Sequence, residues 1–165
     1  MRAGDAARRR WLGALCARFA VCMSVVLTLG LGPAWAIDNP DAPDWTAAFT
    51  ARAQPLEERW SAEAGGPGGG AAAQAYARFL DAELNQAYQA LLQQLQGEPR
   101  RALVQSQRQW LAFRAAETRF INGNFTPQNF GSSSALTRAD GSASLVKQRV
   151  LTLLAYLQNY PAAPR

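Results

Sequence analysis

The sequence contains no histidine and only two cysteines, and both cysteines, Cys16 and Cys22, lie near its beginning. Lys147 is the single lysine, so arginine supplies nearly all of the positive charge. The chain beyond residue 36 therefore has no disulfide and no cysteine nucleophile, and it lacks the imidazole and thiolate ligands of most zinc sites. We expect neither a metal nor a cofactor.

The chain beyond residue 36 also has a net charge close to zero. The first 36 residues hold five of the 17 cations and one of the 12 anions, which leaves 12 against 11 and a net charge of +1. Proteins that bind nucleic acid usually need a pronounced basic surface to neutralise phosphates. The sequence therefore predicts no nucleic-acid partner.

Residues 1–36 have the pattern of an export signal. Arginines precede the apolar run FAVCMSVVLTLGLG (residues 19–32), and AWA at residues 34–36 provides the small side chains of a cleavage site. The run is shorter than the roughly 20 residues of a membrane span, which favours cleavage after Ala36 over an uncleaved anchor. Cys22 precedes most of the run, which is the wrong place for a lipid anchor. We expect a periplasmic or secreted bacterial protein without a stable membrane anchor.

The remaining sequence divides into an arm, a linker and a helical domain. In the arm, residues 37–64, Asp44 is placed to cap a helix that Pro55 is expected to interrupt. The linker, GGPGGG at residues 65–70, has the composition of a flexible tether. The aromatic side chains of the arm allow it either to dock on the domain or to stay loose.

Residues 71–160 predict three helices, because apolar side chains recur at helical spacing and no segment alternates as a strand. We predict an all-α fold, a small antiparallel three-helix bundle with a long loop before the last helix and a short N-terminal helical arm. The helices are expected at residues 71–96, 99–122 and 142–160. Their expected inner faces comprise Tyr76, Leu80, Leu84, Ala87, Tyr88, Leu91 and Leu95; then Leu103, Trp110, Leu111 and Ile121; then Leu145, Val146, Val150, Leu153, Leu157 and Tyr160.

The second of these helices carries an unusually wide apolar arc. Phe113 and Phe120 extend the arc to about 200°, roughly twice the stripe of a surface helix, so we expect the helix to lie between two others. Its opposite side carries Arg101, Arg108 and Arg119, a stripe that could meet an acidic polymer but is more typical of a solvated face.

Polar side chains interrupt the expected inner faces. Gln107 and Arg114 lie within the arc of the second helix, and Arg149 lies within that of the third. A buried guanidinium needs a partner, and Glu117, one turn from Arg114, is the expected one, with Glu83 as a second. These side chains form either a polar network that fixes the helix register or a site for a polar ligand.

Catalysis finds little support in the sequence. Ser144 lies three residues before Lys147, but not in the context of a serine–lysine nucleophile. Glu83 and Glu117 could approach each other across two helices as the paired carboxylates of a glycosidase, but so could many pairs in any bundle. We expect that the protein is not an enzyme, and a hydrolase is the weakest of the functions considered.

The segment GNFTPQNFGSSSALTRAD, residues 123–140, is longer than the ~2–8 residues usual between bundle helices. Long loops of this kind are either functional or disordered, and two phenylalanines, Phe125 and Phe130, argue against disorder. We expect the functional residues of the domain in this loop.

Four stretches of the domain together resemble the lysozyme inhibitor LprI-like family of bacterial envelope proteins. They are DAELNQAYQALL (residues 81–92), LVQSQRQWLAFRAAE (103–117), GSSS (131–134) and LVKQRVLTLLAYL (145–157). Members of the family typically carry cysteines near the positions of Thr118 and Ser144, which this chain lacks. The residues that carry the resemblance are Leu84, Asn85, Tyr88, Gln107, Trp110, Arg114, Glu117, Gly131, Ser132 and Arg149.

The resemblance implies a periplasmic binding protein that inhibits lysozyme-type muramidases through the loop at residues 123–141. An inhibitor of this kind would insert the loop into the sugar cleft of the enzyme and offer donors to its catalytic carboxylates. The alternative is an envelope interaction module that binds another protein or peptidoglycan without inhibiting lysozyme. The candidate contact residues are Phe125, Phe130, Gly131, Ser132, Ser133, Ser134 and Arg138.

Overall fold

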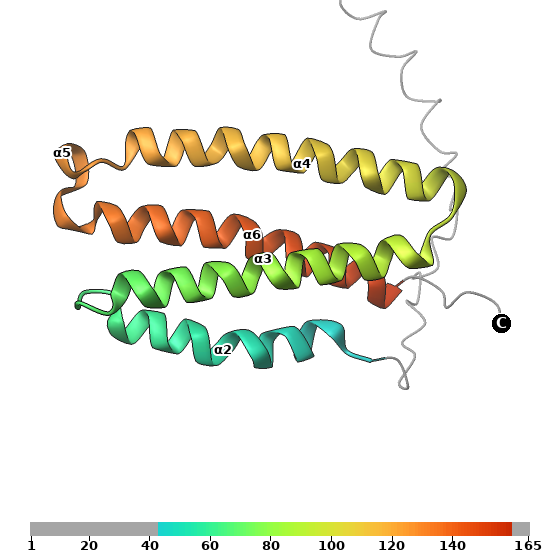
Figure 1. Cartoon of the computed structure of the whole chain (residues 1–165), viewed down its shortest axis with the longest axis horizontal. Coiled ribbons are helices and arrows are strands. Elements are labelled where there is room, and N and C mark those ends of the chain that lie inside the picture. Colours follow the sequence, from blue (N-terminus) through green and yellow to red (C-terminus); the bar gives the residue numbers. More distant parts are fainter. Residues whose placement is uncertain (1–42, 160–165) are drawn as a thin grey trace, which may run out of the picture. The chain divides into compact units, whose positions relative to one another are not determined.

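The computed structural model describes residues 43–159 of the chain. The predicted export signal at residues 1–36 lies outside these residues, as does the predicted helix end at Tyr160. Every regular element of the described part is a helix, which confirms the predicted all-α class (Figure 1). None of the helices between residues 43 and 159 combines the length and the apolarity that a membrane span requires.

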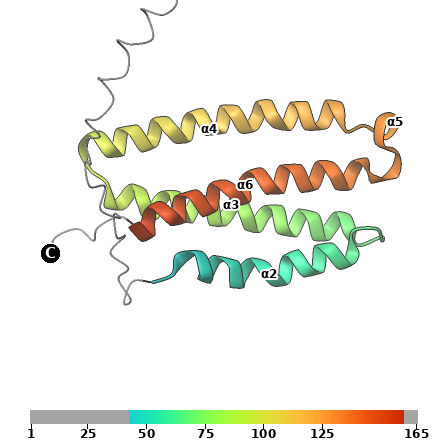
Figure 2. The same cartoon turned by 180° about the vertical axis from the view of Figure 1, so that it is seen from behind.

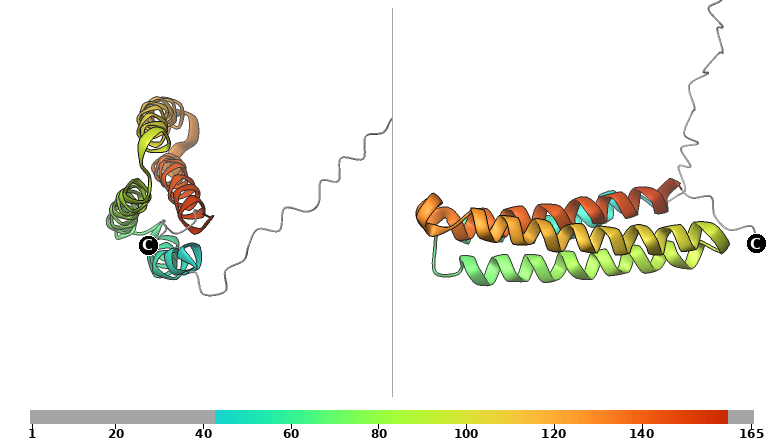
Figure 3. Two further views of the ribbon diagram at one scale, coloured as in Figure 1. Left: turned by 90° about the vertical axis from the view of Figure 1, so that its right-hand side faces the viewer. Right: turned by 90° about the horizontal axis from the view of Figure 1, so that it is seen from above.

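Four long helices, rather than the three predicted, form the bundle between residues 43 and 159. α3 and α6 lie side by side, with α2 against one side of this pair and α4 against the other (Figure 1; from behind in Figure 2; end-on in Figure 3). In chain order the elements are α2 (Trp45–Glu63), α3 (Gly69–Gln94), α4 (Gly97–Asn124), the short α5 (Pro127–Phe130), the 3₁₀ turn η1 (Gly131–Ser133) and α6 (Ser134–Asn159).

The hydrophobic core lies between α2, α3 and α6. The inner faces predicted for α3 and for α6 up to Leu157 are confirmed, apart from Tyr88 and Leu145, which are half-buried. Burial of each large apolar side chain contributes about 1.5–3 kcal/mol, so these three helices hold most of the stabilising area. The largest fully buried side chains are Phe49, Leu80, Leu91, Val150 and Leu153.

The predicted arm is a docked helix, which settles the choice between docked and loose. Asp44 caps α2 as expected, since its Oδ1 accepts a hydrogen bond from the backbone N–H of Ala47 at 2.8 Å. The predicted interruption at Pro55 is wrong, because α2 continues through it. Pro55 is exposed, so water can donate to the carbonyl that proline leaves unbonded. Burial of Phe49 and Ala53 holds the helix in place.

The glycine-rich segment forms a tight turn between α2 and α3. The backbone N–H of Gly66 donates to the carbonyl of Glu63 at 2.9 Å, and that of Gly69 donates to the carbonyl of Gly66 at 3.1 Å. A Cβ on Gly69 would lie 2.6 Å from the carbonyl oxygen of Glu63 and 2.9 Å from that of Ala64. Only glycine therefore allows the first turn of α3 to approach the end of α2 this closely.

Alanine at position 69 is expected to destabilise the fold by about 1–3 kcal/mol, because the added methyl group collides with backbone atoms that cannot move aside. The matched control is Gly70→Ala, since nothing lies within 4 Å of a Cβ on this exposed neighbour. We expect Gly70→Ala to stabilise the helix by about 0.5–1 kcal/mol. Urea denaturation followed by circular dichroism measures both changes, and equal effects of the two substitutions would contradict the close approach.

α4 is not enclosed between two helices, contrary to the prediction from its wide apolar arc. Leu103, Gln107 and Ile121 are buried, but Phe113 is 51% exposed and Phe120 is 57% exposed. The predicted inner residue Leu111 is also exposed, and Trp110 is half-buried. The reason is the position of α4, which lies on the outside of the bundle and packs mainly on α6, so that only a narrow stripe is covered.

The predicted long loop is almost entirely helical. Only Phe125 and Thr126 fall outside helical structure, and α6 begins at Ser134 instead of the predicted Ser142. Gly141, which interrupts the apolar pattern, lies inside α6. A Cβ on this glycine would be 3.3 Å from Cδ1 of Ile121, so the glycine permits close packing of α6 on α4 and does not end a helix.

Candidate functional site

Residues 123–141 form a compact corner at one end of the bundle, where α5 and η1 connect α4 to α6 (Figure 1). The rings of Phe125 and Phe130 pack together with centroids 4.7 Å apart. The guanidinium of Arg138 donates to the backbone carbonyl of Phe125. Nδ2 of Asn129 donates to the carbonyl of Asn124 at 3.1 Å. These contacts hold the corner in one conformation.

Some of the predicted contact residues are exposed at the corner, and others are partly or fully buried. Phe130, Gly131, Ser132 and Ser133 are exposed, and Gly131 has a φ of +61°, which lets the chain reverse between α5 and η1. Ser134 is only 3% exposed, so its hydroxyl faces the interior and is closed to a partner. Phe125 and Arg138 are half-buried and support the corner from within.

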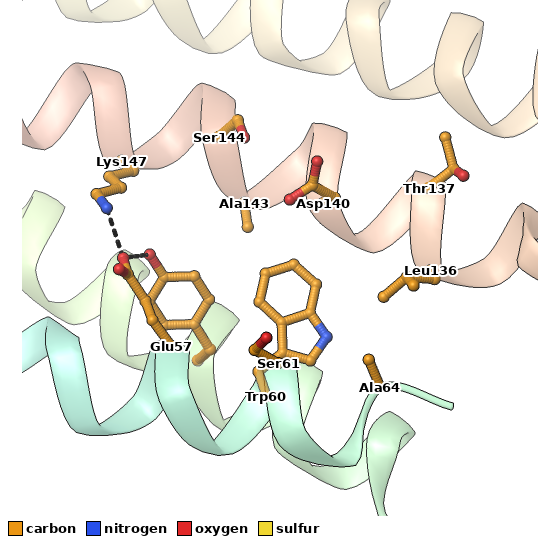
Figure 4. Close-up of a pocket in the computed structure, with 11 residues that line it drawn as sticks. Glu57, Trp60, Ser61, Ala64, Leu136, Thr137, Asp140, Ala143, Ser144 and Lys147 are labelled. Carbon is orange, nitrogen blue, oxygen red and sulfur yellow. Dashed lines mark hydrogen bonds and ion pairs between the residues drawn. The ribbon is translucent and has the colours of Figure 1, made fainter. Parts of the chain in front are cut away.

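A cleft of about 680 Å³ lies beside the corner, between the C-terminal half of α2 and the N-terminal half of α6. Trp60 and Ser61 line it from α2, and Asp140 lines it from α6 (Figure 4). Tyr76 of α3 forms part of its wall and lies beside Trp60, with ring centroids 5.5 Å apart.

Glu57 joins three helices at one end of this cleft. Its Oε1 accepts a hydrogen bond from Nζ of Lys147 on α6 at 2.6 Å, and it also accepts one from the hydroxyl of Tyr76 on α3 (Figure 4). Burial opposes the ionisation of Glu57, but these two hydrogen bonds and the charge of Lys147 outweigh it and lower its pKa. Burial, reinforced by Glu57, raises the pKa of Tyr76, so the tyrosine remains a donor.

The structure does not turn Ser144 and Lys147 into a catalytic pair. Nζ of Lys147 donates to the carboxylate of Glu57 at 2.6 Å, and within residues 43–159 no hydrogen bond joins it to Ser144. Within residues 43–159, no group of three acidic side chains is arranged to hold a metal ion.

Sequence reasoning missed this cleft. In the sequence, Trp60 is one of the aromatic side chains through which the arm could dock, and Asp140 lies in the predicted loop. The two sides of the cleft are about 80 residues apart in the chain, and no local pattern connects them. An extension of the last helix back to Ser134 would have placed Asp140 on a helix, but its pairing with α2 depends on tertiary packing.

A family model described as lysozyme inhibitor LprI matches residues 62–153, more than half of the chain. The chain belongs to the lysozyme inhibitor LprI family. The match confirms the resemblance found in the sequence, and its range includes α3, α4, the corner and most of α6. Comparison with curated proteins and with solved structures gave no match. Nearly all of α2 precedes the matched range, although α2 supplies part of the core and one side of the cleft.

Four of the ten residues that carry the LprI resemblance connect α4 to its neighbours: Gln107, Trp110, Arg114 and Arg149. Arg149 of α6 donates from Nε to Oε1 of the buried Gln107 at 3.1 Å, and from Nη2 to Oγ of Ser106 at 3.2 Å. The guanidinium carbons of Arg114 and Arg149 both lie 5.8 Å from the ring centroid of Trp110. Arg149, Gln107 and Trp110 therefore connect α6 to α4.

The partner predicted for Arg114 is wrong. Its Nη1 donates to Oδ1 of Asp81 on α3 at 2.8 Å, and not to Glu117 on its own helix or to Glu83. Glu83 instead accepts two hydrogen bonds from Arg52 of α2, at 2.9 and 2.7 Å. Both arginines thus bind carboxylates of α3, one from each side. Of the other family residues, Leu84 is buried, Tyr88 and Glu117 are half-buried, and Asn85 is exposed.

Proposed function

We propose that this protein is an exported inhibitor of lysozyme in the bacterial envelope and that its corner contacts the enzyme. Membership of the lysozyme inhibitor LprI family carries the first part of the proposal. The pattern of an export signal at residues 1–36 supports the location. The assignment of the contact to the corner rests on its exposure and rigidity.

The corner has two properties that suit an inhibitor. Its exposed tip combines the apolar ring of Phe130 with the hydroxyl of Ser132, which can donate to the carboxylates of a sugar-cleaving site. Its internal hydrogen bonds fix this tip before binding, for example that from Oγ of Ser133 to the carbonyl of Phe130 at 2.8 Å. A preorganised loop loses less conformational entropy when it binds, which strengthens the complex.

We expect the purified protein, produced with its own export signal, to reduce the rate at which a lysozyme of the animal type clears a suspension of bacterial cell walls. Phe130→Ala is expected to raise the apparent inhibition constant about tenfold or more, as the loss of a central aromatic anchor does in other interfaces. Point substitutions are preferable to deletion of residues 131–134, because that deletion would remove η1 and the first residue of α6.

The matched control is Phe113→Ala, which removes a ring of the same kind and similar exposure from α4. Circular dichroism of each variant shows whether the fold is retained. Unchanged lysozyme activity in the presence of excess wild-type protein would reject the proposed inhibition. If the protein inhibits but Phe113→Ala weakens it more than Phe130→Ala does, the contact surface lies on α4 and the assignment to the corner is wrong.

The second candidate is an envelope interaction module that does not affect lysozyme. The observation in its favour is the exposed apolar surface of α4, where Leu111, Phe113 and Phe120 are each about half exposed. Aromatic rings are enriched in protein–protein interfaces, and Arg108 and Arg119 on the same helix could add contacts to an acidic partner. This candidate predicts no inhibition in the lysozyme assay.

A further inference from the structure

The cleft between α2 and α6 contains a carboxylate without a counterion. Asp140 forms no ion pair with any residue between 43 and 159, whereas Glu57 is bound by Lys147. With Glu57, Asp140 and Lys147 ionised, the cleft carries one net negative charge. A cationic ligand would neutralise it.

Trp60 gives this negative cleft an aromatic wall. The indole is half-buried and packed beside Tyr76. Figure 4 shows Asp140, on α6, across the cleft from this indole. A cation between them would contact the negative face of the ring and the carboxylate together, and each of these interactions favours positive charge.

We propose that this cleft binds a guanidinium group, supplied as an arginine side chain by the protein partner. A guanidinium is planar and can lie against the indole of Trp60 while two of its N–H groups bind the carboxylate of Asp140. Its remaining donors can reach hydroxyl oxygens on the rim, which Ser61 and Thr137 supply. An ammonium group has no plane to stack on the ring, so arginine fits better than lysine.

The cleft and the corner belong to one continuous surface. Leu136, Thr137 and Asp140 line the cleft and also belong to the corner, residues 123–141. A protein seated on the tip of the corner would therefore lie next to the cleft. The identity of the partner as lysozyme rests on the proposed function, but the preference of the cleft for a guanidinium does not.

The direct test is an NMR titration of the full chain with Nα-acetyl-arginine amide, read at the indole N–H of Trp60 and the backbone N–H of Asp140. The matched probe is Nα-acetyl-citrulline amide, which has nearly the same shape and no charge. We expect the arginine probe to shift both signals and the citrulline probe to leave them nearly unchanged. Equal shifts with both probes, or no shift up to the solubility limit of the arginine probe, would overturn the proposal.

The variant Asp140→Asn is expected to weaken binding of the arginine probe about tenfold, because it removes the charge and keeps the shape. Asp140 is exposed, so the substitution should leave the melting temperature unchanged. Glu58→Gln is the control, since Glu58 is an exposed carboxylate of α2 that does not line the cleft. A neutral disaccharide of N-acetylglucosamine that shifts Trp60 equally in wild type and Asp140→Asn, with no response to arginine, would identify a sugar site and reject the guanidinium site.

The lysozyme assay separates this inference from the proposed function. If both hold, Asp140→Asn raises the inhibition constant about tenfold and Glu58→Gln leaves it unchanged. If the wild-type protein does not inhibit lysozyme, the proposed function fails, while the arginine titration still decides the chemistry of the cleft. Full inhibition by Asp140→Asn would show that lysozyme does not place an arginine in the cleft and would reject that part of the proposal.

Discussion

Phe49→Ala is expected to lower the free energy of unfolding by about 3–5 kcal/mol, the largest effect that we predict for a single substitution in this protein. Phe49 is 0% exposed, and its ring lies parallel to that of Phe79 on α3 with centroids 6.0 Å apart. Truncation loses the transfer free energy of the ring and leaves a cavity between α2, α3 and α6. Domains of this size have only about 5–15 kcal/mol of total stability, so the loss is severe.

The Phe49 variant also tests whether α2 is part of the folded domain. This question arises because α2 lies almost wholly outside the range that matches the LprI family. Trp45→Ala is the control on the same helix, since Trp45 is 42% exposed and its loss should change stability by about 1 kcal/mol or less. Urea denaturation of both variants gives the comparison. If Phe49→Ala is no worse than Trp45→Ala, α2 does not complete the core, and the cleft that depends on α2 is not formed.

Arg149→Ala is expected to destabilise the fold by about 2 kcal/mol. The buried Gln107, 8% exposed, would lose the donor to its Oε1, and an unsatisfied buried polar atom costs about 1–3 kcal/mol. Trp110 would also lose one of its two guanidinium neighbours. Burial lowers the pKa of Arg149 from its usual value, which reflects how far this charge is withdrawn from water.

Two further variants identify the cause of this loss. Arg108→Ala removes an exposed arginine from α4 and should change stability by less than about 0.5 kcal/mol. The double variant Arg149→Ala with Gln107→Leu should recover part of the loss, because no buried polar group is then left without a partner. Denaturant midpoints provide the measurement. A midpoint for Arg149→Ala equal to that of the wild type would show that the network does not hold α4 on α6.

The sequence predicted the inner faces of α3 and α6 well. Leu80, Leu84 and Leu91 recur at helical spacing, as do Val146, Val150 and Leu153, and all six are buried. This success has a local cause: side chains three or four residues apart share one face of a helix whatever that helix packs against. The same reasoning found Asp44 as a cap, because capping involves only neighbouring residues.

The corner and the cleft could be predicted only in part. The sequence predicted that the functional residues lie within 123–141. In the structure, however, Ser134 is buried and Arg138 donates a hydrogen bond to the backbone of the corner itself. Gly141 was the last residue of the predicted loop, and in the structure it lies inside α6 against Ile121, although glycine is a poor helix former. The sequence could not predict that Asp140 and Trp60 line the same cleft, because they do so only when α2 packs against the rest of the bundle.

The sequence by itself determined the helical class, the faces that α3 and α6 bury, and the residues that identify the LprI family. Tertiary structure decided that α2 completes the core, that α4 leaves half of its apolar arc in water, and that Arg114 binds Asp81 instead of Glu117. Spacing along the chain fixes which side chains share a helix face. It does not fix which helix covers that face, because the choice depends on the total area that all the helices bury together.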